Sequence, residues 1–353
     1  MCATTSDVIP TVITKSHILG ILPEDLKEKL GKLRFKPFMS TQILDWVYKK
    51  NVIDFMQMSN ISKANQLLLQ DHFYTDWYTK LERLPSKEEL AIKLVFKLND
   101  GAMIEAVILK EKTYNTLCVS SQAGCPVDCK FCLTGVVGFK RNLEVHEIVG
   151  QVLAANQEGH PISHLVFMGM GEPLLNFDNV FKAIRIINSE EGFHISKRKM
   201  TVSTSGYLHG IERLIREKIY INLAFSVGCA NSAKRELLMP IEKRNPLPQV
   251  AQALHRYQEL HNRKLTLEYT LLEDKNDSPQ DIKELCALAK YLKAKINLIN
   301  LNPHPKIPFK PVSTKTLHAI RDSILEARLP VTIRFKKGQD ISAACGQLGE
   351  SYL

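Results

Sequence analysis

The sequence predicts an α/β fold, namely a partial (β/α)6 barrel that follows a small helical domain and a β-hairpin. Three observations support this fold class. From about residue 115 onward, short β-rich runs alternate with helical segments, and repeated strand–helix units form a parallel sheet. Before that point two strand-like runs flank a tight turn, and the first eighty-odd residues carry helical patterns.

Residues 1–84 are predicted to form a helical accessory domain. Ile43, Trp46 and Val47 recur at helical spacing, which places them in one apolar stripe. Ser62 is the kind of residue that caps the start of a helix, here one that runs to Phe73. We expect the stripe to form the core of this domain.

Residues 85–114 are predicted to form a β-hairpin extension. The apolar runs 91–98 and 102–109 flank Asn99-Asp100-Gly101, and an Asp-Gly turn between such runs is a strong hairpin signal. Glu105 interrupts the second run, so it either faces outward, as strand alternation favours, or is buried. A buried carboxylate is often a functional residue.

Residues 115–353 are predicted to form the barrel. Its β-rich runs are 116–120, 164–168, 200–203, 219–226, 265–271 and 296–301. Helical character between the runs is clearest at 143–156, 179–188 and 279–293. Six units are too few for a closed eight-stranded barrel, so we expect an open barrel with its ligands at the C-terminal ends of the strands.

The composition indicates a soluble globular protein with a polyanionic partner. Of 353 residues, 44% are hydrophobic and 24% are charged, the formal net charge is +10 and the sequence pI is about 9.1. Such a charge favours nucleic acid as the partner. We find no signal peptide and no run long enough to span a membrane, so we expect an intracellular protein whose eight cysteines serve metal binding or catalysis rather than disulfides.

The strongest local signal is a group of three cysteines, Cys125, Cys129 and Cys132, just after the first barrel strand. A zinc site would need a fourth Cys or His nearby, and none lies within ten residues of Cys132. A ferredoxin-like run would also need a fourth cysteine. Three thiolates would instead leave one iron of a [4Fe-4S] cluster open. The alternative is three buried cysteines whose spacing is a coincidence.

This motif resembles that of the radical S-adenosylmethionine superfamily, in which an aromatic residue, here Phe131, precedes the third cysteine. The resemblance implies one [4Fe-4S] cluster whose open iron binds S-adenosylmethionine. The turn Gly169-Met170-Gly171-Glu172 follows the next strand and is similar to the superfamily's amino-group-binding motif. Gly171 lets the backbone approach a ligand closely, and Glu172 can accept hydrogen bonds from an ammonium group.

Within the superfamily, the chain resembles the RlmN/Cfr family of RNA adenine methyltransferases over nearly its whole length. The strings that carry this resemblance are 117–122, 138–143, 169–176, 203–206, 276–278 and 343–348. Pro173 and Ser205 are similar to the RlmN branch, which methylates C2 of adenine. A Cfr-like methyltransferase that acts on C8 is the alternative. An iron–sulfur electron carrier would leave the turn 169–172 and Cys345 without a task. An inactive RNA-binding relative is a further alternative, which the altered loop 226–229 favours and the presence of every proposed catalytic residue opposes.

The family resemblance implies a mechanism with two molecules of S-adenosylmethionine per turnover. The first methylates Cys345; the second is cleaved on the cluster, and its radical takes hydrogen from the S-methyl group. The resulting methylene radical adds to adenine, Glu105 removes the ring proton, and Cys118 attacks the protein–RNA adduct to leave a Cys118–Cys345 disulfide. From the residues alone, Cys118 is equally well a core cysteine, and Cys345 a cysteine of a partly ordered tail.

Further cofactor contacts follow from the same resemblance. Ser203 and Asn302 match positions that contact S-adenosylmethionine, as do Ser226, Val227 and Gly228. The loop after the predicted strand 219–226 reads Ser-Val-Gly-Cys, whereas the family usually has Ser-Leu-His-Ala at this point. Only main-chain contacts are therefore expected to persist there. Lys337 replaces an arginine of the family and keeps the charge without the planar fork.

The implied partners are RNA and a reducing system. The family's substrates are an adenosine of 23S rRNA and, in some members, the adenosine 3′ of the anticodon in tRNA; the base must be flipped out to reach the barrel. Basic pairs at 140–141, 197–199, 243–244 and 336–337 are candidates for phosphate contacts, and the helical domain is expected to bind RNA as well. We further expect flavodoxin or a similar electron donor, cellular thiols, a monomer, and a cytoplasmic location.

Overall fold

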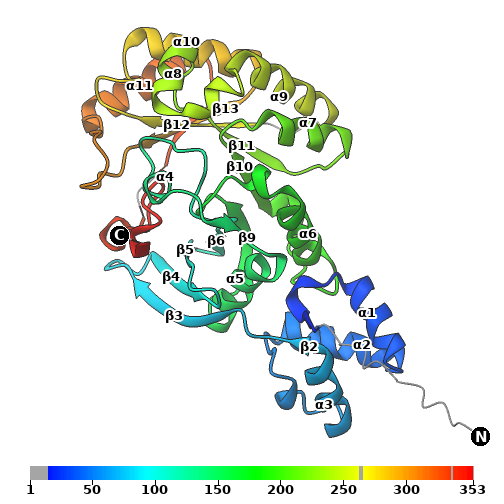
Figure 1. Ribbon diagram of the computed structural model, residues 1–353. Coiled ribbons are helices and arrows are strands. Elements are labelled where there is room, and N and C mark those ends of the chain that lie inside the picture. The colour runs from blue at the N-terminus through cyan, green and yellow to red at the C-terminus, as the bar shows by residue number, and fades with distance from the viewer. Residues whose placement is uncertain (1–14, 262–264, 335–336, 353) are drawn as a thin grey trace, which may run out of the picture.

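The protein is organised around one ten-stranded sheet, in a computed structural model that describes residues 15–261, 265–334 and 337–352 (Figure 1). The strand order is β14-β13-β12-β11-β10-β9-β6-β5-β4-β3. The bounds are β3 Tyr78–Pro85, β4 Ala91–Leu98, β5 Met103–Lys110, β6 Asn115–Cys118, β9 Ile162–Phe167, β10 Met200–Thr204, β11 Asn222–Ser226, β12 Thr266–Leu271, β13 Lys295–Asn300 and β14 Val331–Ile333.

The barrel part of the sheet is parallel throughout, from β6 to β14. Each of the six predicted β-rich runs overlaps one of its strands. β14 adds a seventh, which is only three residues long and was not predicted. Because β14 and β3 stand at opposite edges, the sheet does not close. This is the open α/β barrel that the sequence predicts.

The hairpin is continuous with the barrel rather than separate from it. β4 pairs antiparallel with β5 around the predicted turn, and β5 pairs with the first barrel strand, β6. β3 lies within residues 1–84, so the prediction that this whole range is helical is wrong for residues 78–84. The cause is that β3 is an edge strand with mostly exposed side chains, which erases the alternation by which a strand is detected.

Helices connect the strands and cover one face of the sheet (Figure 1). Their bounds are α1 Pro23–Lys32, α2 Pro37–Leu44, α3 Lys63–His72, α4 Leu133–Val137, α5 Val145–Gln157, α6 Phe177–Asn188, α7 Leu208–Arg216, α8 Ser232–Leu238, α9 Leu247–His261, α10 Pro279–Tyr291 and α11 Thr314–Glu326. In the N-terminal part, the Ser62 hydroxyl accepts from the Asn65 N–H as a helix cap. Ile43 and Val47 are buried and Trp46 packs against the same core, as predicted.

The two faces of the hairpin and first barrel strand have different surroundings. Alternate side chains such as Leu94, Ile104 and Leu117 belong to the main hydrophobic core. The residues between them, among them Val107 and Cys118, form a second small cluster with residues near the C-terminus. Because side chains alternate along a strand, the second face looks into the barrel. The C-terminal segment lies against this inner face.

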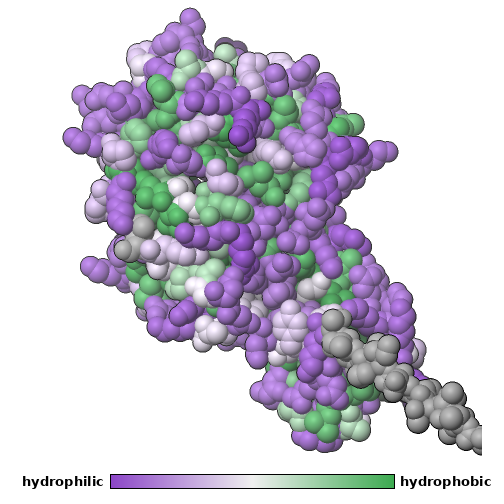
Figure 2. All heavy atoms as spheres, in the orientation of Figure 1, coloured by the Kyte–Doolittle hydropathy of each residue, from purple (hydrophilic) through white to green (hydrophobic). Residues whose placement is uncertain are grey.

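The surface seen in Figure 2 is mostly hydrophilic, and its visible hydrophobic residues gather near the middle of this face. Figure 1 places the C-terminal segment and the barrel mouth in that region. Within the described residues, no helix combines the length and apolar character that a membrane crossing needs.

Candidate active site

Two adjoining cavities lie at the C-terminal ends of the parallel strands. The first, called here the motif cavity, has a volume of about 160 Å³ and contains all three cysteines of the motif. The second, called the tail cavity, has a volume of about 320 Å³ and contains Cys118 and Cys345. Both positions agree with the expectation that ligands bind at this end of the barrel.

The motif cavity suits an iron–sulfur cluster. Burial raises the pKa of the thiols of Cys125, Cys129 and Cys132, and the charge of Cys132 raises the pKa of the other two further. Three buried thiolates therefore need a cationic centre to stay ionised. Within the described residues, no three Cys, His, Asp or Glu side chains surround a single point closely enough to hold one metal ion. Three thiols that line one cavity suit an iron–sulfur cluster, in which each cysteine would bind a different iron.

The Gly-Met-Gly-Glu turn forms the wall beside the cysteines. A Cβ atom at Gly169 would lie 2.6 Å from the Val119 carbonyl oxygen, and Gly171 has a φ of +101° with Gln122 directly against it. Only glycine allows such an approach. The buried Glu172 carboxylate accepts from the N–H of Leu174 at 3.1 Å and from the N–H and hydroxyl of Ser205, both at 2.7 Å.

These contacts make Glu172 a link between two loops of the cavity. Burial raises the pKa of its carboxyl group, and the hydrogen bonds from Ser205 and Leu174 act in the opposite direction. Glu172 lies on the loop after β9 and Ser205 on the loop after β10. The residue thus lines the cavity and also fixes its walls.

The next two strands supply most of the remaining predicted contacts. Ser203 and Ser226 line the motif cavity with their hydroxyl oxygens 3.4 Å apart, and Gly228 lies beside them. Val227 has a buried side chain, and its carbonyl accepts from Nε of Arg235 at 2.9 Å. The Val227 N–H donates to the Glu268 carbonyl oxygen at 3.0 Å, and Val227 does not line the motif cavity.

Arg235 organises this cavity, although the sequence did not point to it. Its guanidinium is fully buried, pairs with Glu242, and also donates to the Ser205 carbonyl oxygen at 2.5 Å. Together with its bond to Val227, this ties the loop after β10 to the loop after β11. In the sequence it is one arginine among many in a helix, and nothing distinguishes it.

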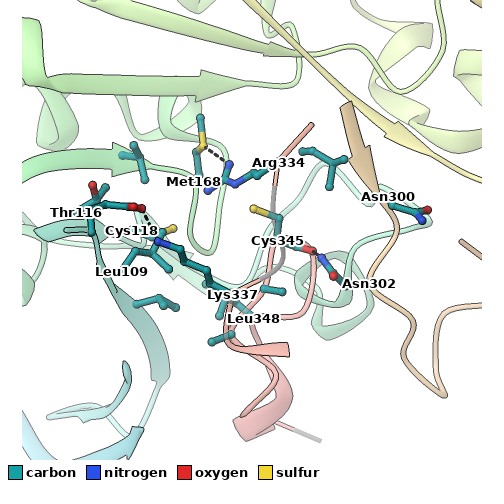
Figure 3. A pocket seen from close by; sticks show the side chains of 16 residues that line it. Leu109, Thr116, Cys118, Met168, Asn300, Asn302, Arg334, Lys337, Cys345 and Leu348 are labelled. Atoms are coloured by element: carbon teal, nitrogen blue, oxygen red, sulfur yellow. Dashed lines mark hydrogen bonds and ion pairs between the residues drawn. The ribbon is translucent and has the colours of Figure 1, made fainter. Parts of the chain in front are cut away.

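The tail cavity brings the two predicted catalytic cysteines together. Figure 3 shows Cys118, from β6, and Cys345, from the C-terminal segment, on facing walls. Cys345 also lines the motif cavity. The residues common to both cavities are Met168, Ile299, Arg334 and Cys345. Cys345 therefore lies in the wall between them.

The loop that carries Cys345 is held by hydrogen bonds to the carbonyl oxygens of Cys345 and of two residues that follow it. The Asn302 amide donates to the Cys345 carbonyl oxygen at 3.0 Å, and the Leu133 N–H donates to that of Gly346 at 2.8 Å. The Thr134 hydroxyl donates to the Leu348 carbonyl oxygen at 2.6 Å. Asn302 thus lies in the tail cavity, apart from the other predicted cofactor contacts, and its own Oδ1 has no partner among the described residues.

Arg334 is a second residue that sequence reasoning missed. Burial raises the pKa of the Cys118 thiol to about 12, and the positive charge of Arg334 acts against this rise. The charges of Cys345, Glu268 and Cys118 in turn raise the pKa of Arg334. Its guanidinium donates to the Met168 sulfur at 3.4 Å (Figure 3). Because Arg334 follows the unpredicted strand β14, its place in the barrel mouth could not be foreseen.

Glu105 is fully buried on the inner face of the sheet, which settles the question of whether it faces outward. It lies two residues from Val107, which pairs with Cys118 across β5 and β6 and lines the tail cavity. Glu105 itself does not line either cavity, because the C-terminal segment covers it. The Ser351 N–H donates to its Oε1 at 3.0 Å.

An open parallel barrel with a three-cysteine loop after its first strand and a Gly-x-Gly-Glu turn after its second defines a radical S-adenosylmethionine fold. Residues 119–289 match the radical SAM superfamily, and residues 16–74 match the ribosomal RNA large subunit methyltransferase N-terminal domain. A radical SAM methyltransferase from Sphaerobacter thermophilus has a crystal structure similar to this one, with a TM-score of 0.91 and 34% identity over 95% of this chain and 99% of that one.

Curated relatives narrow the class further. A probable dual-specificity RNA methyltransferase RlmN from Akkermansia muciniphila is 42% identical over 96% of this chain and 94% of its own length. Its counterpart from Aquifex aeolicus is 40% identical over 92% of this chain and 94% of its own length. The chain therefore belongs to the RlmN family of radical S-adenosylmethionine RNA methyltransferases. Its cofactors are a [4Fe-4S] cluster and S-adenosylmethionine.

Replacement of Glu172 tests how the motif cavity binds S-adenosylmethionine. We expect Glu172→Gln to retain its iron but to bind the cofactor more weakly by roughly 1.5–3 kcal/mol, the value of a hydrogen bond to a charged group. Glutamine keeps an acceptor for Ser205, so the walls of the cavity should persist. Isothermal calorimetry on the reconstituted protein measures the change. Unchanged affinity would mean that Glu172 serves only to hold the loops.

Proposed function

We propose that the protein methylates C2 of a specific adenosine in 23S rRNA and also the adenosine 3′ of the anticodon in tRNAs. The observation that carries the proposal is the position of Cys345 in the wall between the two cavities, opposite Cys118. Its relatives' names, which describe dual-specificity RNA methyltransferases, support two RNA substrates. Pro173 and Ser205 favour the C2-specific branch of the family.

The target atom explains why two cavities are needed. C2 of adenine lies between two ring nitrogens and is too electron-poor to attack a methyl sulfonium. When bound in the motif cavity, the cluster and S-adenosylmethionine supply a carbon radical that avoids this difficulty. Cys125, Cys129 and Cys132 hold the cluster. Contacts to S-adenosylmethionine come from Gly171, Glu172, Ser203, Ser226 and Gly228, which line the motif cavity, whereas Val227 and Asn302 lie outside its lining.

Cys345 carries the methyl group between the two reactants. Its thiol would accept the methyl group, and S-adenosylmethionine bound in the motif cavity would supply the radical chemistry that activates this group. Cys345 lines both cavities, so one side chain can receive the methyl group on one side and present it to RNA on the other. Asn302 fixes the main chain of Cys345 during both steps.

Glu105 and Cys118 complete the reaction. Glu105 removes the proton from C2 after the new carbon–carbon bond has formed. Cys118 then attacks the sulfur of Cys345, and the sulfur–carbon bond breaks with its electron pair on the carbon, which takes up a proton to become the methyl group of the RNA. A Cys118–Cys345 disulfide remains, and cellular thiols reduce it. The positive charge of Arg334 stabilises the attacking thiolate, whose burial otherwise favours the neutral thiol.

The RNA contacts and the other partners are also part of the proposal. Lys140 and Arg244 are exposed and available to bind phosphates, whereas Lys243, although exposed, pairs with Glu236 at 3.5 Å. Arg141 and Lys337 are engaged instead, Arg141 with Asp100 and Glu147 and Lys337 with Glu111, while Lys336 lies outside the described residues. The N-terminal helical domain binds RNA, a flavodoxin-type donor supplies electrons, and the enzyme acts as a cytoplasmic monomer.

Nucleoside mass spectrometry tests this function. We expect 2-methyladenosine to disappear from both 23S rRNA and tRNA of cells that lack the protein, and to return when the gene is restored. Loss of 8-methyladenosine would show a Cfr-like enzyme instead. Loss from rRNA alone would remove tRNA from the substrates. An unchanged modification pattern in both RNAs would contradict the proposal.

A further inference from the structure

Lys93 is a buried lysine beside the proposed base. It lies on β4 with its side chain 3% exposed, and its Nζ is 3.7 Å from Oε2 of Glu105, whose side chain is fully buried. Lysine is rarely buried unless it is paired, because removing an ammonium group from water is costly. No step of the reaction described so far uses this charge.

The register of the strands places this lysine on the reacting face. Val95 of β4 stands opposite Glu105, and Lys93 stands opposite Val107, which in turn pairs with Cys118. Alternation along each strand puts Lys93, Glu105, Val107 and Cys118 on one face of the sheet. That is the inner face, which borders the tail cavity. Lys93 and Glu105 are therefore diagonal neighbours on adjacent strands, close to Cys118 on the next strand.

The distance decides how the two side chains interact. At 3.7 Å the pair attract as charges but do not form a hydrogen bond. Oε2 of Glu105 has no hydrogen-bond partner among the described residues, whereas Oε1 accepts from the Ser351 N–H. A buried carboxylate needs a neighbouring cation to stay ionised. Lys93 supplies that charge and leaves Oε2 free to accept a proton.

The ammonium group of Lys93 also contacts the C-terminal segment that covers Glu105. Nζ of Lys93 is 3.7 Å from Oε2 of Glu350, and the Tyr352 hydroxyl accepts from the Met103 N–H at 2.8 Å. Glu350 is half-exposed, so water already solvates its charge. The fully buried Glu105 depends on the lysine far more strongly. Tyr352 and Glu350 are the other ionisable groups at this point of the C-terminal segment.

We propose that Lys93 is a positioning residue that keeps Glu105 ionised, with Oε2 free, for removal of the C2 proton. In this step the C2–H bond breaks, the proton goes to Oε2, and the bonding electrons remain in the adenine ring. The inference rests on the proposed role of Glu105 as the base. It adds a residue for which the family resemblance gave no role.

A kinetic isotope effect separates this role from a merely structural one. RNA with deuterium at C2 of the target adenosine is given to reconstituted enzyme with its cofactors, and the methylation rate is compared with that of unlabelled RNA. In Lys93→Met, methylation is expected to slow by at least about tenfold, within the usual contribution of a general base. Proton removal then limits the rate, so a larger isotope effect must accompany the slower reaction. Formation of 5′-deoxyadenosine in the first turnover should not change.

The chain offers a matched control and a second variant. Lys97 lies four residues along β4 on the same face but is exposed, so Lys97→Met should behave like the unmodified protein. Lys93→Gln removes the charge and keeps a polar side chain. The same measurement is made on this variant if Lys93→Met does not fold. Iron content and thermal melting verify the fold of each variant.

The outcomes are distinct. Slower methylation without a larger isotope effect, or with an equal loss of 5′-deoxyadenosine, would make Lys93 a structural residue and overturn the inference. A normal rate in both Lys93 variants would overturn it as well. Normal turnover by Glu105→Gln would instead refute the base itself. If Glu105→Gln is slow and the Lys93 variants are not, only the inference about Lys93 fails.

Discussion

Cys118→Ala is expected to stop the enzyme after a single covalent event, with Cys345 joined to RNA through a stable thioether. The two thiols face one cavity, and attack by Cys118 on the sulfur of Cys345 is the step that frees the product. Alanine removes the nucleophile and leaves the cofactor cavity unchanged, since Cys118 does not line it. The loss of multiple turnover should be essentially complete.

The stalled species identifies itself. It should survive denaturation, disappear on nuclease digestion, and leave a modified peptide that contains Cys345. Cys345→Ala should bind RNA and cofactor but never become methylated. Cys286→Ala is a suitable control, because Cys286 is buried on α10 and does not line either cavity. Normal turnover by Cys118→Ala would show that Cys118 does not release the product. An RNA adduct on another cysteine would show that Cys345 does not carry the methyl group.

Replacing Cys125, Cys129 and Cys132 together by alanine should abolish both the cluster and the cleavage of S-adenosylmethionine. Anaerobically reconstituted protein should contain about four irons, as one [4Fe-4S] cluster requires. Each single alanine variant should lose cleavage, because each cysteine holds one iron. Iron analysis together with electron paramagnetic resonance measures this.

Cys229 provides the matched control for the cluster. It is fully buried in the same small apolar cluster as Cys129 and Phe131, yet it does not line the motif cavity. Its thiol points to the Asp281 carboxylate at 3.7 Å. Cys229→Ala should therefore retain its iron. A full cluster in the triple variant, or loss of iron in Cys229→Ala alone, would contradict the site.

Where local sequence determines local structure, prediction from the sequence succeeded. Asn99-Asp100-Gly101 forms the hairpin turn, Ser62 caps its helix, and the barrel strands from β6 to β13 begin and end within a few residues of their expected runs. The three motif cysteines could be placed together because their spacing is local. Glu105 was identified as an exception within an apolar run, and the fold buries it.

Prediction failed where a residue's surroundings are created only by the tertiary fold. Lys93 and Lys97 are identical residues on one face of one strand. The C-terminal segment and Glu105 enclose the first, while the second is left in solvent. Nothing near either lysine in the sequence distinguishes them. Arg334 depends likewise on β14, a three-residue strand too short to produce a periodic signal.

The departures from the family pattern are accommodated by the fold. Lys337 donates to the carbonyl oxygen of Lys110 at 2.9 Å and pairs with Glu111, so a single ammonium group fixes the start of the C-terminal segment to β5. Gly228, in the altered loop after β11, has a φ of +68° and lies against Met239. A larger residue there would clash with that methionine, which makes glycine suited to this loop.

The shared wall means that this enzyme needs no swinging arm. Proteins that carry a group between two sites usually move it on a long flexible tether or a mobile domain. Here the main chain at Cys345 and just after it is held by Asn302, Leu133 and Thr134. The thiol can still rotate about its Cα–Cβ bond, which takes picoseconds to nanoseconds for an unhindered side chain. In the mechanism proposed above, the methyl group would therefore pass between the two cavities by rotation of this one side chain.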